Sequence, residues 1–262
     1  MMHRRAFRSR LRRREPLLGT FLKTPSSVVS EVLCLTPLDC LCIDAEHAPF
    51  GRAEVDACLM ACAAADKPAL VRVPSAAPHE MLCALDSGAV GIVIPHVVSA
   101  ALARDAVAAC HYRPGGRGYA GSTRAAAFTT KSMHEHIADS ATMTTVIAQI
   151  EDEEALGHLD AIAHTDGLDC MFVGRMDLTV SLGATSPQDP VVVAAVERIV
   201  DAGRTAGIAV GMFVTSVKEA GDWLERGVTF FLVASDQQLL LESVRASSAA
   251  FTGLARPHPG SG

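Results

Sequence analysis

Ionisable side chains gather where an apolar stretch of this sequence ends. The segment LCIDAEHAPF, residues 41–50, begins with Leu, Cys and Ile and then carries Asp44, Glu46 and His47 within four residues. An imidazole with a pKa near ~6.5 is suited to proton transfer at neutral pH. A lone histidine is more often structural, but a histidine beside two acids at the end of a buried strand favours a general base. His47 is therefore a candidate catalytic residue.

An arginine lies inside another strongly apolar segment, LVRVP, at position 72. A buried guanidinium without a partner would be very costly, so Arg72 must meet an anion. One possibility is an internal ion pair with Asp44 or Glu46. The other is a bidentate clamp for the carboxylate of a substrate. The sequence leaves both open.

Two further carboxylates, Glu151 and Asp177, follow apolar segments about one strand–helix unit apart. Two carboxylates from neighbouring strand ends can share a hard cation whose other ligands are water and substrate oxygens. Such a site suits Mg²⁺, Mn²⁺ or Co²⁺ better than a closed structural zinc site. Alternatively, Glu151 is an acid of a first helical turn and Asp177 a cap, each with a solvated carboxylate.

Lysine chemistry offers another way to form a carbanion on an oxo acid, through a Schiff base. The chain has four lysines, at positions 23, 67, 131 and 218, and Lys23 alone falls at the end of a predicted strand. Imine chemistry is thus disfavoured but stays open.

Eight short apolar segments must position these residues. The predicted strands are 17–24, 39–46, 68–74, 90–96, 144–151, 168–175, 208–215 and 230–236, with helical patterns between them. Strands that are apolar on both faces and alternate with helices predict an α/β fold, a single (β/α)8 TIM barrel over residues 17–255. A doubly wound open sheet is the alternative, weakened because no Gly-rich phosphate fingerprint follows the first strand. In a barrel, the polar residues above meet at the carboxyl ends of the strands.

The segments outside the barrel are predicted to lack structure. Residues 1–16, MMHRRAFRSRLRRREP, are expected to form a basic, disordered N-terminal tail, and residues 256–262 a flexible C-terminal tail. A nucleic-acid or membrane arm is the alternative for the basic segment, but the net charge of −6 disfavours nucleic-acid binding. The connection from about 111 to 142 contains YRPGGRGYAGSTRAAAF, then a short predicted helix near 131–140. Connections of this length are commonly functional.

The cysteines and the hydropathy pattern bear on location. Eight cysteines are scattered without CxxC pairs, mostly in apolar segments, so we interpret them as reduced core residues in preference to a disulfide or zinc framework. No apolar run approaches the ~20 residues of a membrane-spanning helix. We expect a cytoplasmic protein with neither membrane nor nucleic-acid partners.

Six motifs in order give the sequence a resemblance to a known family. They are IDAEHAPF, LVRVP, ALDSGAVGIVIPHV, RPGGRGYAG, IAQIED and FVGRMDLTVSLG, spread over residues 17 to 240. Together they resemble the HpcH/HpaI aldolases, the metal-dependent pyruvate aldolases of the phosphoenolpyruvate/pyruvate-binding barrel superfamily. The resemblance implies reversible aldol cleavage of a 4-hydroxy-2-oxo acid to pyruvate and an aldehyde. It also implies a hexamer, built as a trimer of dimers, with the last helix exchanged between subunits.

The resemblance further implies a role for individual residues. Glu151 and Asp177 would bind the divalent metal, with Gln149 nearby. Arg72 would hold the pyruvate carboxylate or the enolate oxygen. His47 with Asp44 would transfer protons through water, oriented by Asp86, while Glu46 gives structural support. The backbone amides of Gly174 to Asp177 would meet the carboxylate.

The sequence departs from the resemblance after its sixth predicted strand. Many relatives read Gly-Pro-Ala-Asp there, whereas this chain has Gly174, Arg175, Met176 and Asp177. Arg175, with Lys23, could recruit an acidic substrate tail, or it could fold away to an interface. The alternative functions are a citrate-lyase-like or CoA-ester lyase or synthase on the same scaffold, and a non-catalytic binder of an oxo acid.

Overall fold

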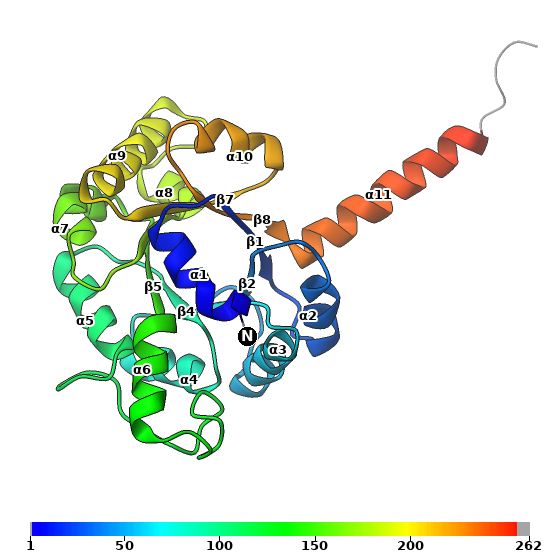
Figure 1. The fold of residues 1–262 in the computed structure, drawn as a ribbon. Coiled ribbons are helices and arrows are strands. Elements are labelled where there is room, and N and C mark those ends of the chain that lie inside the picture. Colours follow the sequence, from blue (N-terminus) through cyan, green and yellow to red (C-terminus); the bar gives the residue numbers. More distant parts are fainter. Residues whose placement is uncertain (1, 256–262) are drawn as a thin grey trace, which may run out of the picture.

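The computed structural model describes residues 2–255, and their strands close into a parallel barrel (Figure 1). The strands are β1 (Leu17–Leu22), β2 (Cys40–Asp44), β3 (Ala69–Arg72), β4 (Gly91–Ile94), β5 (Thr145–Ile150), β6 (Cys170–Val173), β7 (Ala209–Val214) and β8 (Phe230–Ser235). Each pairs with the next in parallel, and β1 pairs with β8. The predicted barrel is confirmed, and the open sheet is wrong because pairing of β1 with β8 leaves no edge strand.

Helices surround this barrel and return the chain to the amino ends of the strands. They are α2 (Ser27–Cys34), α3 (Arg52–Ala64), α4 (Pro78–Asp86), α5 (Ala100–Cys110), α6 (Met133–Met143), α7 (Leu159–Ala163), α8 (Arg175–Ser181), α9 (Pro190–Ala206) and α10 (Val217–Leu224). A short 3₁₀ helix, η1 (Glu153–Gly157), precedes α7. Serine side chains cap α2, α5, α6 and α10, satisfying N–H groups that have no partner within the helix.

Two layers of apolar side chains hold the barrel together. Between strands and helices lies a continuous core of aliphatic residues. The barrel interior is filled by side chains from all eight strands, among them Phe172, Phe230 and Leu232. Filling of this kind makes the interior a packed core and leaves the carboxyl ends of the strands free to carry polar groups.

The basic N-terminal segment is not a disordered tail, so that prediction is wrong for residues 2–12. They form helix α1 (Met2–Arg12), which closes the amino end of the barrel. Phe7 and Leu11 are at most 1% exposed, and the Phe7 ring meets Phe230 edge to face at 6.1 Å. Arg8 Nε lies 3.0 Å from both carboxylate oxygens of buried Asp169. The prediction failed because it relied on the arginine-rich composition and overlooked Phe7 and Leu11, whose spacing of four residues places them on one face of a helix. The predicted tail 256–262 lies outside the described residues.

The last helix, α11 (Asp236–Ala255), projects away from the barrel (Figure 1). It carries exposed apolar side chains along its length, including Leu240 (67%), Val244 (58%) and Phe251 (72%). Neither α11 nor any other helix among residues 2–255 is both long and apolar enough to cross a membrane.

Candidate active site

A pocket of about 320 Å³ opens at the carboxyl ends of the strands, where the sequence placed the polar residues. Its walls come from β1, β3, β5, β6, β7 and β8, from the loop after β2, and from the first turns of α8 and α11. The lining residues are Phe21, Lys23, His47, Arg72, Gln149, Phe172, Gly174, Arg175, Met176, Asp177, Phe213, Ser235 and Gln238. Most of the predicted site residues therefore share one cavity.

Arg72 and Asp44 form a buried ion pair beside this pocket. Arg72 Nε and Nη2 lie 3.0 and 2.8 Å from the two oxygens of Asp44, which is fully buried. Burial favours the protonated acid, but the hydrogen bond and charge of Arg72 hold the pKa of Asp44 below its usual range. The Arg72 guanidinium also stacks on the Phe21 ring at 4.6 Å and lines the pocket. The internal ion pair is thus confirmed, and it fixes a cation where a substrate can reach it.

Asp44 organises two other groups. Its Oδ2 lies 3.2 Å from Lys23 Nζ, and its Oδ1 accepts the backbone N–H of His47 at 3.1 Å. The imidazole of His47 is half exposed, and its Nε2 is 3.6 Å from Glu46 Oε2. The same Glu46 oxygen lies 3.3 Å from Arg72 Nε. Asp44 therefore anchors the loop that carries His47, and Glu46 lies between the His47 ring and Arg72.

Glu151 is buried beside the pocket and held in place by its neighbours. Its carboxylate is a hydrogen-bond acceptor for the His96 backbone N–H at 2.9 Å and for the Gln149 side-chain amide. A side chain at position 174 would collide with this carboxylate, so glycine is required there for the close approach. Burial raises the pKa of Glu151, as does the negative charge of Asp177.

His96 is a site residue that the sequence analysis missed. It ends the predicted strand VGIVIPH, which was the available signal. Its backbone is in the left-handed region (φ 54°), and its Nδ1 lies 3.0 Å from Asp152 Oδ2. A non-glycine residue in this strained conformation is unusual, and here it aims the backbone N–H at Glu151.

These residues fit a divalent cation. Among residues 2–255, Glu46, His96 and Glu151 form a group whose potential ligand atoms all lie within 4.8 Å of one another. Burial raises the pKa of Glu46 as well as that of Glu151, so a nearby cation would stabilise both ionised carboxylates. Gln149 Oε1 is buried without a hydrogen-bond partner in the described part of the chain. An oxygen-rich donor set with an orphaned amide oxygen suits Mg²⁺-like ions.

Two predicted residues lie elsewhere or are already paired. Asp86 is the last residue of α4, toward the amino ends of the strands, where it accepts a hydrogen bond from Arg117. It does not contact His47 within this chain, so its orienting role is not supported by the geometry. Arg175 lines the pocket but is buried and donates to Glu219 of α10. Its charge is therefore partly compensated inside the chain by Glu219.

A sequence model of the HpcH/HpaI aldolase/citrate lyase family matches residues 17–243. The chain belongs to this family. It is 37% identical over 246 residues to the hydroxypyruvate/pyruvate aldolase of Paraburkholderia phytofirmans, with 91% of this chain and 94% of the relative covered. It is 34% identical to the 4-hydroxy-2-oxo-heptane-1,7-dioate aldolase of Salmonella arizonae, covering 94% of each.

A solved structure of an HpcH/HpaI aldolase/citrate lyase family protein from Burkholderia cenocepacia superposes with a TM-score of 0.90 at 35% identity. The superposition covers 95% of this chain and 99% of that one. Because aldolases of the HpcH/HpaI family match over most of its length, the chain is a carbon–carbon lyase, and the family suggests a divalent metal at the site.

Proposed function

We propose that this protein catalyses the metal-dependent, reversible aldol cleavage of a 4-hydroxy-2-oxo acid to pyruvate and an aldehyde. The observation that carries the proposal is the position of Arg72. Asp44 and the Phe21 ring fix its guanidinium in the pocket that also contains Gln149 and Asp177. A fixed positive charge in a pocket that also carries carboxylates is suited to bind an oxo acid whose oxygens become negative during the reaction.

Glu151 and Asp177 are the residues that would hold the divalent cation, Mg²⁺, Mn²⁺ or Co²⁺. Asp177 lies in the pocket, Glu151 lies close enough for the two charges to interact, and Gln149 offers a free amide oxygen between the pocket and Glu151. When bound, the cation supplies a positive charge that polarises the 2-oxo group. Glu46, His96 and Glu151 form the alternative set of metal ligands. In that set, however, Glu46 is already paired with Arg72, and the His96 ring is already paired with Asp152.

Arg72 would bind the pyruvate carboxylate or the developing enolate oxygen. Asp44 already holds the Arg72 guanidinium in its orientation, so this side chain needs to move little when negative charge develops on the substrate. Residues Gly174 to Asp177 line the same pocket, and their backbone amides would meet the carboxylate. Together they would place the 4-hydroxyl side of the substrate toward the loop after β2.

His47 would accept the proton of the 4-hydroxyl, directly or through water. Its ring is half exposed and free to reach the pocket, while Asp44 holds its backbone. Lys23, Arg175 and Met176 would contact the aldehyde half of the substrate, since all three line the pocket.

The assembly and location are also proposals. The exposed apolar side chains of α11 support a homo-oligomer in which this helix packs on a neighbouring subunit, a hexamer by resemblance. All eight cysteines are free thiols, which supports the cytoplasm because thiols stay reduced there.

Pyruvate release from a panel of substrates tests the proposal. The panel should hold neutral and acidic 4-hydroxy-2-oxo acids, including 4-hydroxy-2-oxo-heptane-1,7-dioate, with citrate and a malyl-CoA thioester for the alternative lyase. Arg72→Lys keeps a positive charge but loses the two-pronged fork, and we expect at least a ~10-fold loss of kcat/KM. Turnover confined to citrate or the thioester would overturn the assignment.

A further inference from the structure

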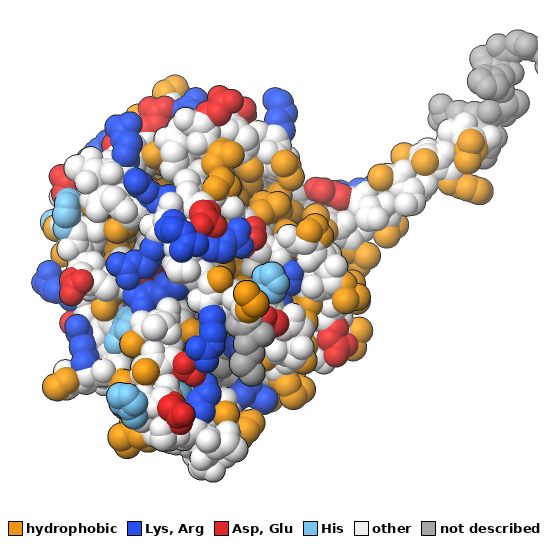
Figure 2. All heavy atoms as spheres, viewed as in Figure 1, with side chains coloured by type: hydrophobic (Ala, Val, Ile, Leu, Met, Phe, Trp, Pro, Cys, Tyr) orange, Lys and Arg blue, Asp and Glu red, His pale blue; other side chains and the backbone are white. Residues whose placement is uncertain are grey.

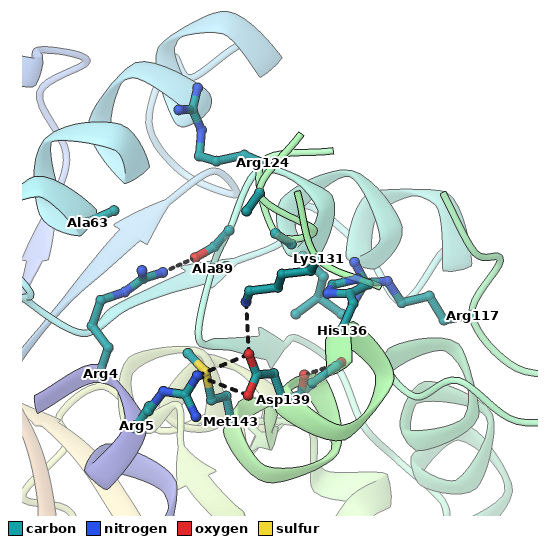
Figure 3. A pocket seen from close by; sticks show the side chains of 16 residues that line it. Arg4, Arg5, Ala63, Ala89, Arg117, Arg124, Lys131, His136, Asp139 and Met143 are labelled. Atoms are coloured by element: carbon teal, nitrogen blue, oxygen red, sulfur yellow. Dashed lines mark hydrogen bonds and ion pairs between the residues drawn. The ribbon is translucent and has the colours of Figure 1, made fainter. Parts of the chain in front are cut away.

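A second cavity, of about 180 Å³, lies at the amino end of the barrel, whereas the pocket of Arg72 opens at the carboxyl ends of the strands. Figure 3 shows this second cavity from close by. It is enclosed by α1, the end of α4, the long connection before α6, and α6 itself. It brings together the two sequence features that the proposed function does not use: the basic N-terminal segment and the Gly- and Arg-rich connection.

Cationic side chains from these distant segments converge on the cavity. Arg4 and Arg5 come from α1, Arg117 from the connection, and Lys131 from the residues just before α6. On the surface, Lys and Arg side chains gather over α1 and continue toward α6 (Figure 2). Arg124 also lines the cavity, but its guanidinium is paired with Asp56 of α3 at 2.7 Å.

One carboxylate serves two of these cations. Asp139 Oδ1 lies 2.9 Å from Arg5 Nη2, and Asp139 Oδ2 lies 2.8 Å from Lys131 Nζ. Figure 3 shows both side chains directed at this carboxylate. Asp139 thus occupies the position that an external anion would take between the two cations.

Other N–H groups at the cavity lack acceptors. Arg117 is only 7% exposed, and its guanidinium stacks on the Tyr112 ring at 4.7 Å and donates a hydrogen bond to Asp86. Its Nε nevertheless has no hydrogen-bond partner among residues 2–255. Arg4 donates to the Gly88 carbonyl at 2.6 Å, and its buried Nε also has no hydrogen-bond partner within that range. Buried donors of this kind are normally satisfied, so two at one cavity point to a missing acceptor.

The neighbouring histidine reports the same positive environment. His136 is buried in the cavity wall, and its pKa is lowered by burial and by the charges of Arg117 and Lys131. Ala63, Leu85, Ala89 and Met143 make part of the remaining wall apolar, and Ser140 and Thr144 add two hydroxyl groups that hydrogen-bond to each other.

The volume limits the ligand. A cavity of 180 Å³ equals the liquid volume of about six waters, below the ~300 Å³ of ordinary metabolite pockets. We propose that this cavity binds a compact oxyanion carrying two negative charges, either a phosphate group or a small dicarboxylate. The ligand displaces Asp139 from Arg5 and Lys131 and accepts from Arg117 and Arg4.

Binding calorimetry on the full-length protein tests the inference at constant ionic strength set with chloride. Inorganic phosphate and succinate are the two probes, and they distinguish the two sources of the oxyanion. The variants are the double substitution Arg5→Gln/Lys131→Gln, the single substitution Asp139→Asn, and Arg204→Gln on α9 as the exposed-cation control. Arg5, Lys131 and Asp139 are all partly exposed, so each variant should fold.

We expect one probe to bind with an affinity that falls at least ~10-fold in the double variant, because two charges at contact distance are lost. Asp139→Asn should raise the affinity about threefold or more, since it removes the competing carboxylate, and Arg204→Gln should leave it unchanged. An oxyanion bound at the active site would respond to none of these changes. Absence of saturable binding for both probes, equal affinity in all four proteins, or a loss in Asp139→Asn would overturn the inference.

Discussion

Glu151 is the residue on which both potential metal sites depend. It belongs to the group with Glu46 and His96, and its pKa also responds to the charge of Asp177. His96 contacts it through a backbone N–H at 2.9 Å, which a side-chain substitution preserves. Asp177, by contrast, can reach the cation only through its carboxylate. This difference allows the two sets to be separated.

We predict that Asp177→Asn weakens Mn²⁺ binding by ~10-fold or more, whereas His96→Ala changes it less than about threefold. Loss of an anionic ligand removes direct attraction for the cation, and loss of the His96 ring leaves Glu151 in place. Equilibrium titration with Mn²⁺, followed by electron paramagnetic resonance, measures both. If His96→Ala weakened Mn²⁺ binding more than Asp177→Asn does, the metal ligands would instead be Glu46, His96 and Glu151.

The residues found from sequence and those missed differ in a simple way. Asp44, Arg72 and Glu151 were recognisable because charge at the end of, or within, an apolar strand is costly unless it is used or paired. His96 was missed because its contribution comes from its backbone N–H and unusual φ, which side-chain chemistry does not reveal. Asp86 was assigned through resemblance alone, and its position on α4 follows from tertiary packing that no single motif encodes.

At the scale of elements, the strands were predictable and α1 was not. Eight apolar segments buried on both faces specify barrel strands with little ambiguity, and only their ends shifted by a few residues. In α1, the five arginines of residues 2–12 make the segment look too basic for a buried helix and obscure the apolar residues Phe7 and Leu11. The helix is stabilised because the side chains of Phe7 and Leu11 are buried at the end of the barrel and Arg8 donates a hydrogen bond to buried Asp169.

Phe7→Ala should therefore destabilise the protein by about 3–5 kcal/mol, because it removes a fully buried aromatic ring and leaves a cavity against Phe230. Denaturant unfolding followed by circular dichroism measures this change. Met2→Ala, on the same helix but 85% exposed, is the matched control and should stay within about 0.5 kcal/mol. Equal, small effects in both variants would mean that α1 does not contribute to the stability of the barrel.

At the scale of the whole molecule, α11 is the element that its own barrel leaves uncovered. Leu240 and Val244 are one helical turn apart on an exposed face. Two carboxylates there would oppose burial of this face against a neighbouring subunit. We predict that Leu240→Glu/Val244→Glu lowers the assembly mass measured by light scattering after size-exclusion chromatography.

Gln237→Glu, an exposed position near the start of the same helix, adds one charge and serves as the control for that experiment. It should leave the mass unchanged. A double variant that assembles like the unmodified protein would show that α11 does not mediate association.

The central claim is that a divalent cation, and not a lysine imine, supports carbon–carbon cleavage at the barrel mouth. Lys23 is the lysine in the pocket, and its Nζ lies 3.2 Å from Asp44 Oδ2. The decisive measurement is pyruvate release from a 4-hydroxy-2-oxo acid after EDTA treatment, after return of Mn²⁺, Mg²⁺ or Co²⁺, and after borohydride with pyruvate. We predict that EDTA abolishes release, that at least one of the three ions restores it, and that borohydride has no effect. Release that persists in EDTA but is lost after borohydride treatment would contradict this account.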